Sequence, residues 1–298
     1  MTSSTAFLPP GMLERLGGLE IIAKTVVRGF QAGIHRSPLR GAGEDFAKHR
    51  DYQQGDDVRY LDWKLYARSD RLYVREFEER SNLQAYVVVD ASASMDYGGA
   101  GGVTKLRYAS YVAAALAHLM IGAGDAVGLA AFGAEPRLLL APRARKGHLH
   151  DLLLNLERLQ PGGNGGAPEL LDRVGAMMPR GGRVIVISDL LEDDDGADFV
   201  AAAGRLRARG DEVMVLRVLT PEETGDAAPD AGLFFDPEHP ARQVPATPRQ
   251  DAGYARRVAA YYDSLAGRLR ERGVEYVPLS TAQPVEQALV AWVNRRRG

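Results

Sequence analysis

The chain of 298 residues contains no cysteine, which excludes a disulfide scaffold, thiolate metal sites, thiol nucleophiles and iron–sulfur clusters. It also lacks a basic excess: 37 lysines and arginines face 39 acidic residues, which argues against a general nucleic-acid binder. Long apolar runs are missing, because the most apolar stretch (111–123) contains His118 and is too short to span a bilayer. No signal-peptide pattern begins the sequence. We therefore expect a soluble, cytoplasmic protein without membrane insertion.

Residues 1–43 form a lead-in to the rest of the chain. Its first apolar residues recur at roughly helical spacing: Leu13, Leu16, Leu19 or Ile21, and Val26. Basic residues and glycines then follow: Arg28, Gly33, Arg36, Arg40, Gly41 and Gly43. This second half is expected to be a mobile, solvated basic linker.

Residues 44–80 combine dense charge with aromatic rings. The segment contains ten acidic, eight basic and seven aromatic residues. Disordered charged tails are poor in aromatics, so we expect this extension to fold. A layer that packs on a larger body, anchored by Trp63 and Tyr66, fits this composition, and residues 72–77 loosely suggest a short strand.

From residue 81 to 298 the chain alternates between β-branched runs and helical patterns. The predicted strands are 84–90, 125–132, 136–142, 183–190, 212–219 and 274–280. The predicted helices are 105–122, 148–159, 168–178, 197–209, 256–272 and 285–296. Alternating strands and helices predict an α/β fold, a doubly wound and mostly parallel sheet of about six strands, with 84–90 inside it and 183–189 alongside. A proline-rich stretch near 220–250 predicts a small inserted hairpin at one sheet edge, with strands at 233–236 and 241–244.

Oxygen-bearing side chains follow two of the buried strands. Asp90, Ser92 and Ser94 alternate after the first, and Asp189 ends the strand that begins at residue 183. Ligands of open α/β sheets bind outside the carboxyl ends of the strands, where the strand order reverses. Carboxylates and hydroxyls suit a hard cation such as Mg²⁺. The alternative is structural, with the two serines acting as caps of the following helix.

The sequence DASAS at 90–94, the following helix, GDAVGLAAF at 124–132 and ISD at 187–189 resemble a von Willebrand factor A-type domain with its metal-ion-dependent adhesion site. With the upstream stretch 43–80, the chain is more similar still to the bacterial family known as domain of unknown function 58. The resemblance spans about residues 40–295, so 81–298 is expected to be the von Willebrand factor A-like, Rossmann-type domain.

The resemblance implies that Ser92 and Ser94 coordinate Mg²⁺ or Mn²⁺ directly, that Asp90 and Asp189 help partly through water, and that a partner protein supplies a carboxylate. The family pattern also expects a threonine where this chain has Ala167 and Pro168. Neither offers a side-chain oxygen, which leaves Asn164 or Glu169 as substitutes or a degenerate site.

The resemblance further implies a non-enzymatic protein-interaction module that works with a MoxR-type AAA+ ATPase and a client protein in the assembly or maturation of complexes. One alternative is a metal-assisted hydrolase that uses Asp90 and Asp189, with Glu192 as a conceivable base. Another is nucleic-acid binding through the basic stretch 28–50, which the ten acidic residues of 44–80 disfavour.

Overall fold

The computed structural model describes residues 9–36, 49–51, 73–75, 83–99, 102–135, 137–163, 165–191, 195–224, 232–235, 243–246 and 253–295. Its strands are β1 (His49–Asp51), β2 (Tyr73–Arg75), β3 (Gln84–Asp90), β4 (Ala126–Phe132), β5 (Arg137–Arg143), β6 (Arg183–Ser188), β7 (Glu212–Leu219), β8 (Gly232–Phe235), β9 (Gln243–Ala246) and β10 (Glu275–Ser280). Its α-helices are α1 (Pro10–Leu13), α2 (Leu19–Arg36), α4 (Lys105–Gly122), α5 (Lys146–Glu157), α6 (Ala167–Met177), α7 (Ala197–Ala208), α8 (Pro221–Thr224), α9 (Tyr254–Glu271) and α10 (Glu286–Arg295). Short 3₁₀ turns occur at η1 (Glu14–Leu16) and η3 (Ala93–Asp96).

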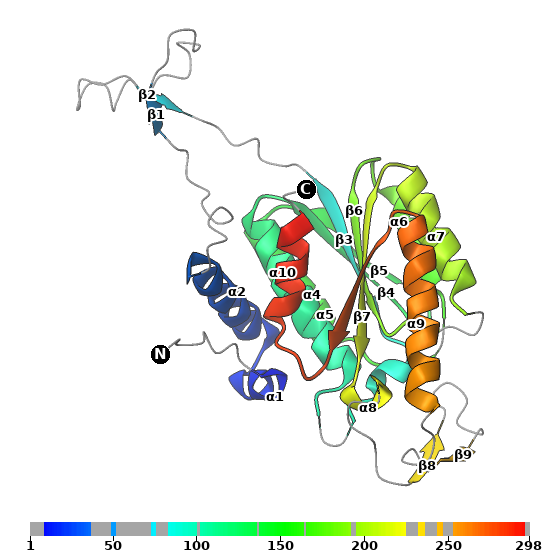
Figure 1. Cartoon of the computed structure of the whole chain (residues 1–298). Coiled ribbons are helices and arrows are strands. Elements are labelled where there is room, and N and C mark those ends of the chain that lie inside the picture. The colour runs from blue at the N-terminus through cyan, green and yellow to red at the C-terminus, as the bar shows by residue number, and fades with distance from the viewer. Residues whose placement is uncertain are drawn as a thin grey trace.

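Six of the described strands form one sheet in the order β10-β7-β6-β3-β4-β5 (Figure 1). All neighbours are parallel except β4 and β5, which are antiparallel. Since β3 is the first of the six along the chain and β6 the fourth, the order is that of a doubly wound sheet whose direction of winding reverses between β3 and β6. The predicted α/β class, the interior place of 84–90 and its pairing with 183–189 are all confirmed.

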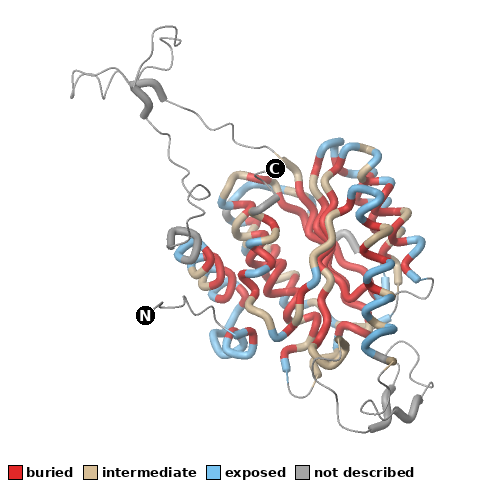
Figure 2. The backbone as a smooth tube through the Cα atoms, in the orientation of Figure 1, coloured by how far each residue is buried: buried red, intermediate tan, exposed pale blue. Residues whose placement is uncertain are grey.

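Helices cover both faces of this sheet, as Figures 1 and 2 show. Alternate residues of β3 enter opposite cores: Val87 and Val89 pack with α2, α4, α5 and α10, while Tyr86 and Val88 pack with α6, α7 and α9. All four side chains are at most 1% exposed. Burial on both faces explains why these strands are continuous apolar runs.

Helix α2 adds a further layer over α4, outside the sheet (Figure 1). Its buried stripe has helical spacing, with Leu19, Ile22, Val26 and Phe30 between 0% and 3% exposed, whereas Ile21 is 54% exposed. The prediction of a mobile linker from Arg28 is therefore wrong as far as Arg36, which ends α2. The linker prediction for 37–43 falls on residues outside the described ranges.

The extension is described only at its short strands, and the insertion only at its short strands and at residues 220–224. β1 pairs with β2, and β8 with β9, both antiparallel. The predicted anchors Trp63 and Tyr66 lie outside the described ranges, as does most of 44–80. The inserted hairpin follows β7, which is one strand in from the sheet edge at β10, rather than leaving from the edge itself. Across the described ranges, no helix has the length and apolarity needed to cross a bilayer.

Candidate functional site

The reversal of strand order places the ends of β3 and β6 side by side. Val89 is in register with Ile187, so the next residues, Asp90 and Ser188, are neighbours. The Ser188 hydroxyl donates a hydrogen bond of 2.5 Å to Oδ2 of Asp90. The parallel pairing of the two strands thus joins the two oxygen clusters that the sequence predicted at their ends.

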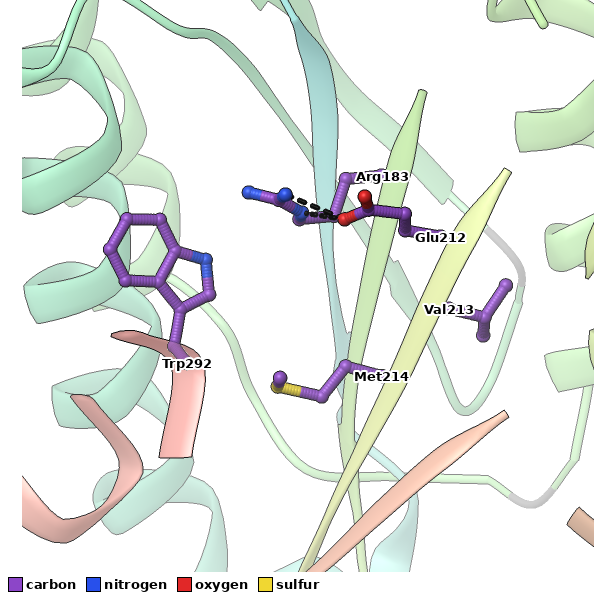
Figure 3. A pocket seen from close by; sticks show the side chains of 5 residues that line it. All are labelled: Arg183, Glu212, Val213, Met214 and Trp292. Atoms are coloured by element: carbon purple, nitrogen blue, oxygen red, sulfur yellow. Dashed lines mark hydrogen bonds and ion pairs between the residues drawn. The ribbon is translucent and has the colours of Figure 1, made fainter. Parts of the chain in front are cut away.

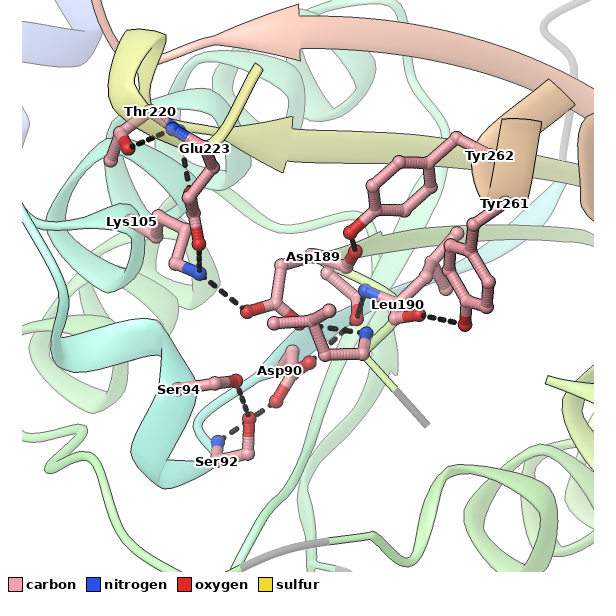
Figure 4. A network of polar contacts seen from close by, with 12 residues as sticks. Asp90, Ser92, Ser94, Lys105, Asp189, Leu190, Thr220, Glu223, Tyr261 and Tyr262 are labelled. Atoms are coloured by element: carbon pink, nitrogen blue, oxygen red, sulfur yellow. Dashed lines mark hydrogen bonds and ion pairs between the residues drawn. The ribbon is translucent and has the colours of Figure 1, made fainter. Parts of the chain in front are cut away.

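The turn after β3 brings Asp90, Ser92 and Ser94 together (Figure 4). The Ser92 amide donates a 2.8 Å hydrogen bond to Oδ1 of Asp90, and the Ser92 and Ser94 hydroxyl oxygens lie 3.0 Å apart. All three side chains are buried, at 3–4% exposure. Burial, and next the charge of Asp189, raise the pKa of Asp90 to about 7, although the hydrogen bonds from Ser188 and Ser92 oppose this.

The turn after β6 is fixed by a second set of hydrogen bonds. Leu190 has a φ of 57°, in the left-handed region that a leucine rarely adopts. Its amide donates to the Ser188 hydroxyl oxygen (2.8 Å), and the Leu191 amide donates to Oδ1 of Asp189 (3.1 Å). From α9, the Tyr262 hydroxyl donates to the Asp189 carbonyl and the Tyr261 hydroxyl to the Leu190 carbonyl, both at 2.9 Å. These bonds hold Asp189 in place against the local strain.

The structure adds a residue that the sequence reasoning missed, Lys105. Its Nζ lies 2.7 Å from Oδ2 of Asp189 and 2.6 Å from Oε1 of Glu223, and the lysine is 1% exposed (Figure 4). Burial alone would lower the pKa of the ammonium, but Asp189 and Glu223 outweigh it and raise the pKa above 10.5. One signal was available: Lys105 begins a helix, where the helix dipole disfavours a cation unless anions lie nearby.

The loop before α6, where the family pattern expects a threonine, packs against the turn after β3. The Ala93 amide donates to the Gly163 carbonyl (2.8 Å), and the Gly162 amide donates to the Ala91 carbonyl (2.9 Å). Gly163, at φ 67°, approaches Ala134 so closely that a Cβ would lie 2.3 Å from the Ala134 Cα. Because Gly163 has no side chain, the backbone of this loop comes close enough to the turn after β3 to form these hydrogen bonds.

The side chains of this loop supply no hydroxyl to the site. Ala167 is fully buried at the start of α6, and of the two possible substitutes Glu169 is exposed while Asn164 is outside the described ranges.

The donor atoms after β3 fit a small hard cation. Mg²⁺ binds oxygens at about 2.1 Å in octahedral geometry, which puts adjacent ligand oxygens about 3.0 Å apart. The Ser92 and Ser94 oxygens, which are hydrogen-bonded to each other, have this separation, so a cation would take the place of that hydrogen bond without moving either oxygen far. Asp189 is less available, because one oxygen accepts from Lys105 and the other from a backbone amide. In the described part of the chain, no cluster of three or more histidine, aspartate or glutamate side chains is arranged to hold a metal.

A pocket at the opposite end of the sheet is too small to be a second candidate for the functional site. It is lined by Arg183, Glu212, Val213, Met214 and Trp292 (Figure 3) and has a volume of about 10 Å³, which is room for one water molecule at most. Arg183 begins β6 and Glu212 begins β7, and their side chains are paired through a 2.7 Å hydrogen bond. The pocket is a small gap beside an ion pair.

Comparison with known proteins places these features in a family. Uncharacterized proteins of Mycobacterium tuberculosis and Mycobacterium bovis are 29% identical to this chain over 97% of its length and 91% of theirs.

Among solved structures, the conserved hypothetical protein BatB from Bacteroides thetaiotaomicron is similar in fold, with a TM-score of 0.51 and 16% identity over 72% of this chain and 98% of that one. A von Willebrand factor type A protein from Catenulispora acidiphila is also similar, with a TM-score of 0.36 and 16% identity over 66% of this chain and 44% of that one.

Residues 48–250 match the family described as protein of unknown function DUF58. The match includes residues 48–80 of the upstream stretch, both strands of the site and the insertion. It confirms the family resemblance seen in the sequence and covers more than half of the chain. This protein belongs to the DUF58 family.

Proposed function

We propose that this protein is a non-enzymatic protein-interaction module whose binding face is the carboxyl end of the sheet at β3 and β6. The reversal of strand order lies there, which is where α/β sheets of this type bind their ligands. Beside the buried polar cluster, Leu191 is 46% exposed and offers an apolar contact at the same face.

The proposal includes a divalent cation, Mg²⁺ or Mn²⁺, held by Asp90, Ser92 and Ser94, with Asp189 contributing through water. The observation that carries it is the 3.0 Å separation of the Ser92 and Ser94 hydroxyl oxygens beside a buried carboxylate. When bound, the cation would offer a coordination position to a carboxylate of the partner protein. Metal and partner would then strengthen each other's binding.

The alternative hydrolase needs a general base within reach of an attacking water. Asp90 and Asp189 are 3% and 1% exposed, and each of their four carboxylate oxygens accepts a hydrogen bond from the protein. This favours a positioning role for both carboxylates over proton transfer. Glu192, the other base considered, lies outside the described ranges.

For the partner we propose a MoxR-type AAA+ ATPase in the cytoplasm, with a client protein whose assembly or maturation the pair assists. The support for this partner is the family resemblance of the sequence. In this proposal, a surface acidic residue of the ATPase or the client would complete the coordination of the cation at the site.

The test is a pull-down with a MoxR-type AAA+ ATPase, in Mg²⁺ and in EDTA. Retention should require Mg²⁺ and should be lost in Asp90→Ala. Asp172→Ala is the matched control, because Asp172 on α6 is 51% exposed and pairs with Arg205 on α7 at the surface. Equal retention in EDTA and in Asp90→Ala would contradict a metal-dependent interaction at this site.

A further inference from the structure

Lys105 is a buried cation placed on one of the proposed site's carboxylates. Its Nζ contacts Asp189 on β6's turn and Glu223 on α8, residues that lie 84 and 118 positions further along the chain. The ammonium also lies over the ring of Tyr97, 6.0 Å from its centroid. A buried lysine at the first position of a helix is stable only with such anionic partners.

We propose that Lys105 is an internal counter-cation that withholds Asp189 from the divalent metal and so weakens metal binding by the free protein. This inference rests on the proposed function, because it concerns the regulation of the same cation site. While Lys105 is in place, Oδ2 of Asp189 accepts from the ammonium and Oδ1 from the Leu191 amide. The ammonium, 2.7 Å from Oδ2, compensates the negative charge of Asp189, so this carboxylate attracts a metal-bound water less strongly than a free carboxylate would.

Glu223 gives the ammonium a second anchor. Its Oε1 accepts from Lys105 at 2.6 Å, and its Oε2 accepts from the Thr220 amide at 2.8 Å, which fixes the carboxylate at the end of β7. The site therefore stays assembled without metal, because the charge of Asp189 is already compensated. A divalent cation has to act against a positive charge in a buried, weakly screened environment, where charge–charge interactions are stronger than in water.

The test measures Mn²⁺ binding by electron paramagnetic resonance in the full chain and in the double variant Lys105→Met/Glu223→Gln. The double variant removes one positive and one negative charge, so the net charge of the cluster is unchanged while Asp189 is released. Its Kd for Mn²⁺ should be lower than that of the natural chain by at least about tenfold. Glu223→Gln alone keeps the ammonium on Asp189 and should bind Mn²⁺ no more tightly than the natural chain.

Each outcome bears on the inference. If the natural chain binds Mn²⁺ and the double variant binds it equally or more weakly, the inference is overturned while the proposed metal site stands. If only the double variant binds, the inference is supported and the metal dependence of the proposed function fails. If neither binds, both are overturned.

Circular dichroism checks that the variants are folded. Should the double variant not fold, Lys105→Gln/Glu223→Gln, which retains a hydrogen-bond donor at position 105 and the same net charge, replaces it with the same expectation.

Discussion

The carboxyl ends of β3 and β6 lie side by side and each carries a buried aspartate, yet the charges of these two aspartates are balanced differently. Asp189, after β6, faces the ammonium of Lys105 at 2.7 Å. Asp90, the last residue of β3, accepts hydrogen bonds from neutral donors, the Ser188 hydroxyl and the Ser92 amide. The difference shows in the pKa of Asp90, which burial and the neighbouring Asp189 raise to about 7. Asp189 is paired with a cation of the protein itself, the ammonium of Lys105. Asp90 instead lies beside the hydroxyl oxygens of Ser92 and Ser94, which can bind a cation from solution.

The largest effect is expected from removing the internal cation. Lys105→Met leaves Asp189 buried without its partner, and breaking a buried ion pair from one side costs about 3–5 kcal/mol. Urea denaturation in EDTA measures the free energy of unfolding. Lys24→Met is the matched control: its amine lies 2.6 Å from Glu20, but it is 48% exposed, so the loss should be at most about 1 kcal/mol. Similar losses of unfolding free energy in the two variants would show that Lys105 does not compensate the buried charge of Asp189.

A smaller effect is expected from Asp90 as the pH changes in EDTA. Because the pKa of folded Asp90 is about 7 against an ordinary 3.8, the folded protein keeps the proton after the unfolded chain has lost it. The free energy of unfolding should fall as pH rises from about 4 to 7, on the order of 2 kcal/mol in total after allowing for relaxation and water entry.

Asp90→Asn should remove this part of the pH dependence and leave the remainder. A pH profile of the variant parallel to that of the natural chain would contradict the difference between the two turns.

The smallest effect concerns the hydrogen bonds that fix the turn after β6. Tyr262→Phe removes the bond to the Asp189 carbonyl and keeps the ring, so it should cost about 1 kcal/mol. Tyr261→Phe removes a bond of the same length from a half-buried hydroxyl and should cost less. Thermal denaturation of both variants makes the comparison. A larger loss in Tyr261→Phe would place the main support of this turn at Leu190 rather than at Asp189.

The strands and the meeting of the two oxygen clusters could be predicted from local sequence. The run Val87–Val89 needs burial on both faces, and a doubly wound sheet brings the first and fourth strands together. The ion pair of Lys105 with Glu223 could not be predicted from the sequence, because Glu223 lies 118 residues further along the chain and only the fold brings α8 to the start of α4.

The docking of α2 was also missed, although α4 gives a hint. Its buried residues lie on all sides of the helix, which requires a covering element beyond the sheet. Such cover can come from any amphipathic helix, so the sequence of α4 alone does not identify α2 as its partner.

The central claim is that Asp90, Ser92 and Ser94 hold a divalent cation at the end of β3. Crystals of the natural chain soaked in Mn²⁺, with data collected at the manganese absorption edge, test it most directly. The account predicts an anomalous peak about 2.2 Å from the Ser92 and Ser94 hydroxyl oxygens, with Lys105 still paired to Asp189. The absence of a peak there at saturating Mn²⁺ would contradict the claim and leave the two serines a structural role in the turn.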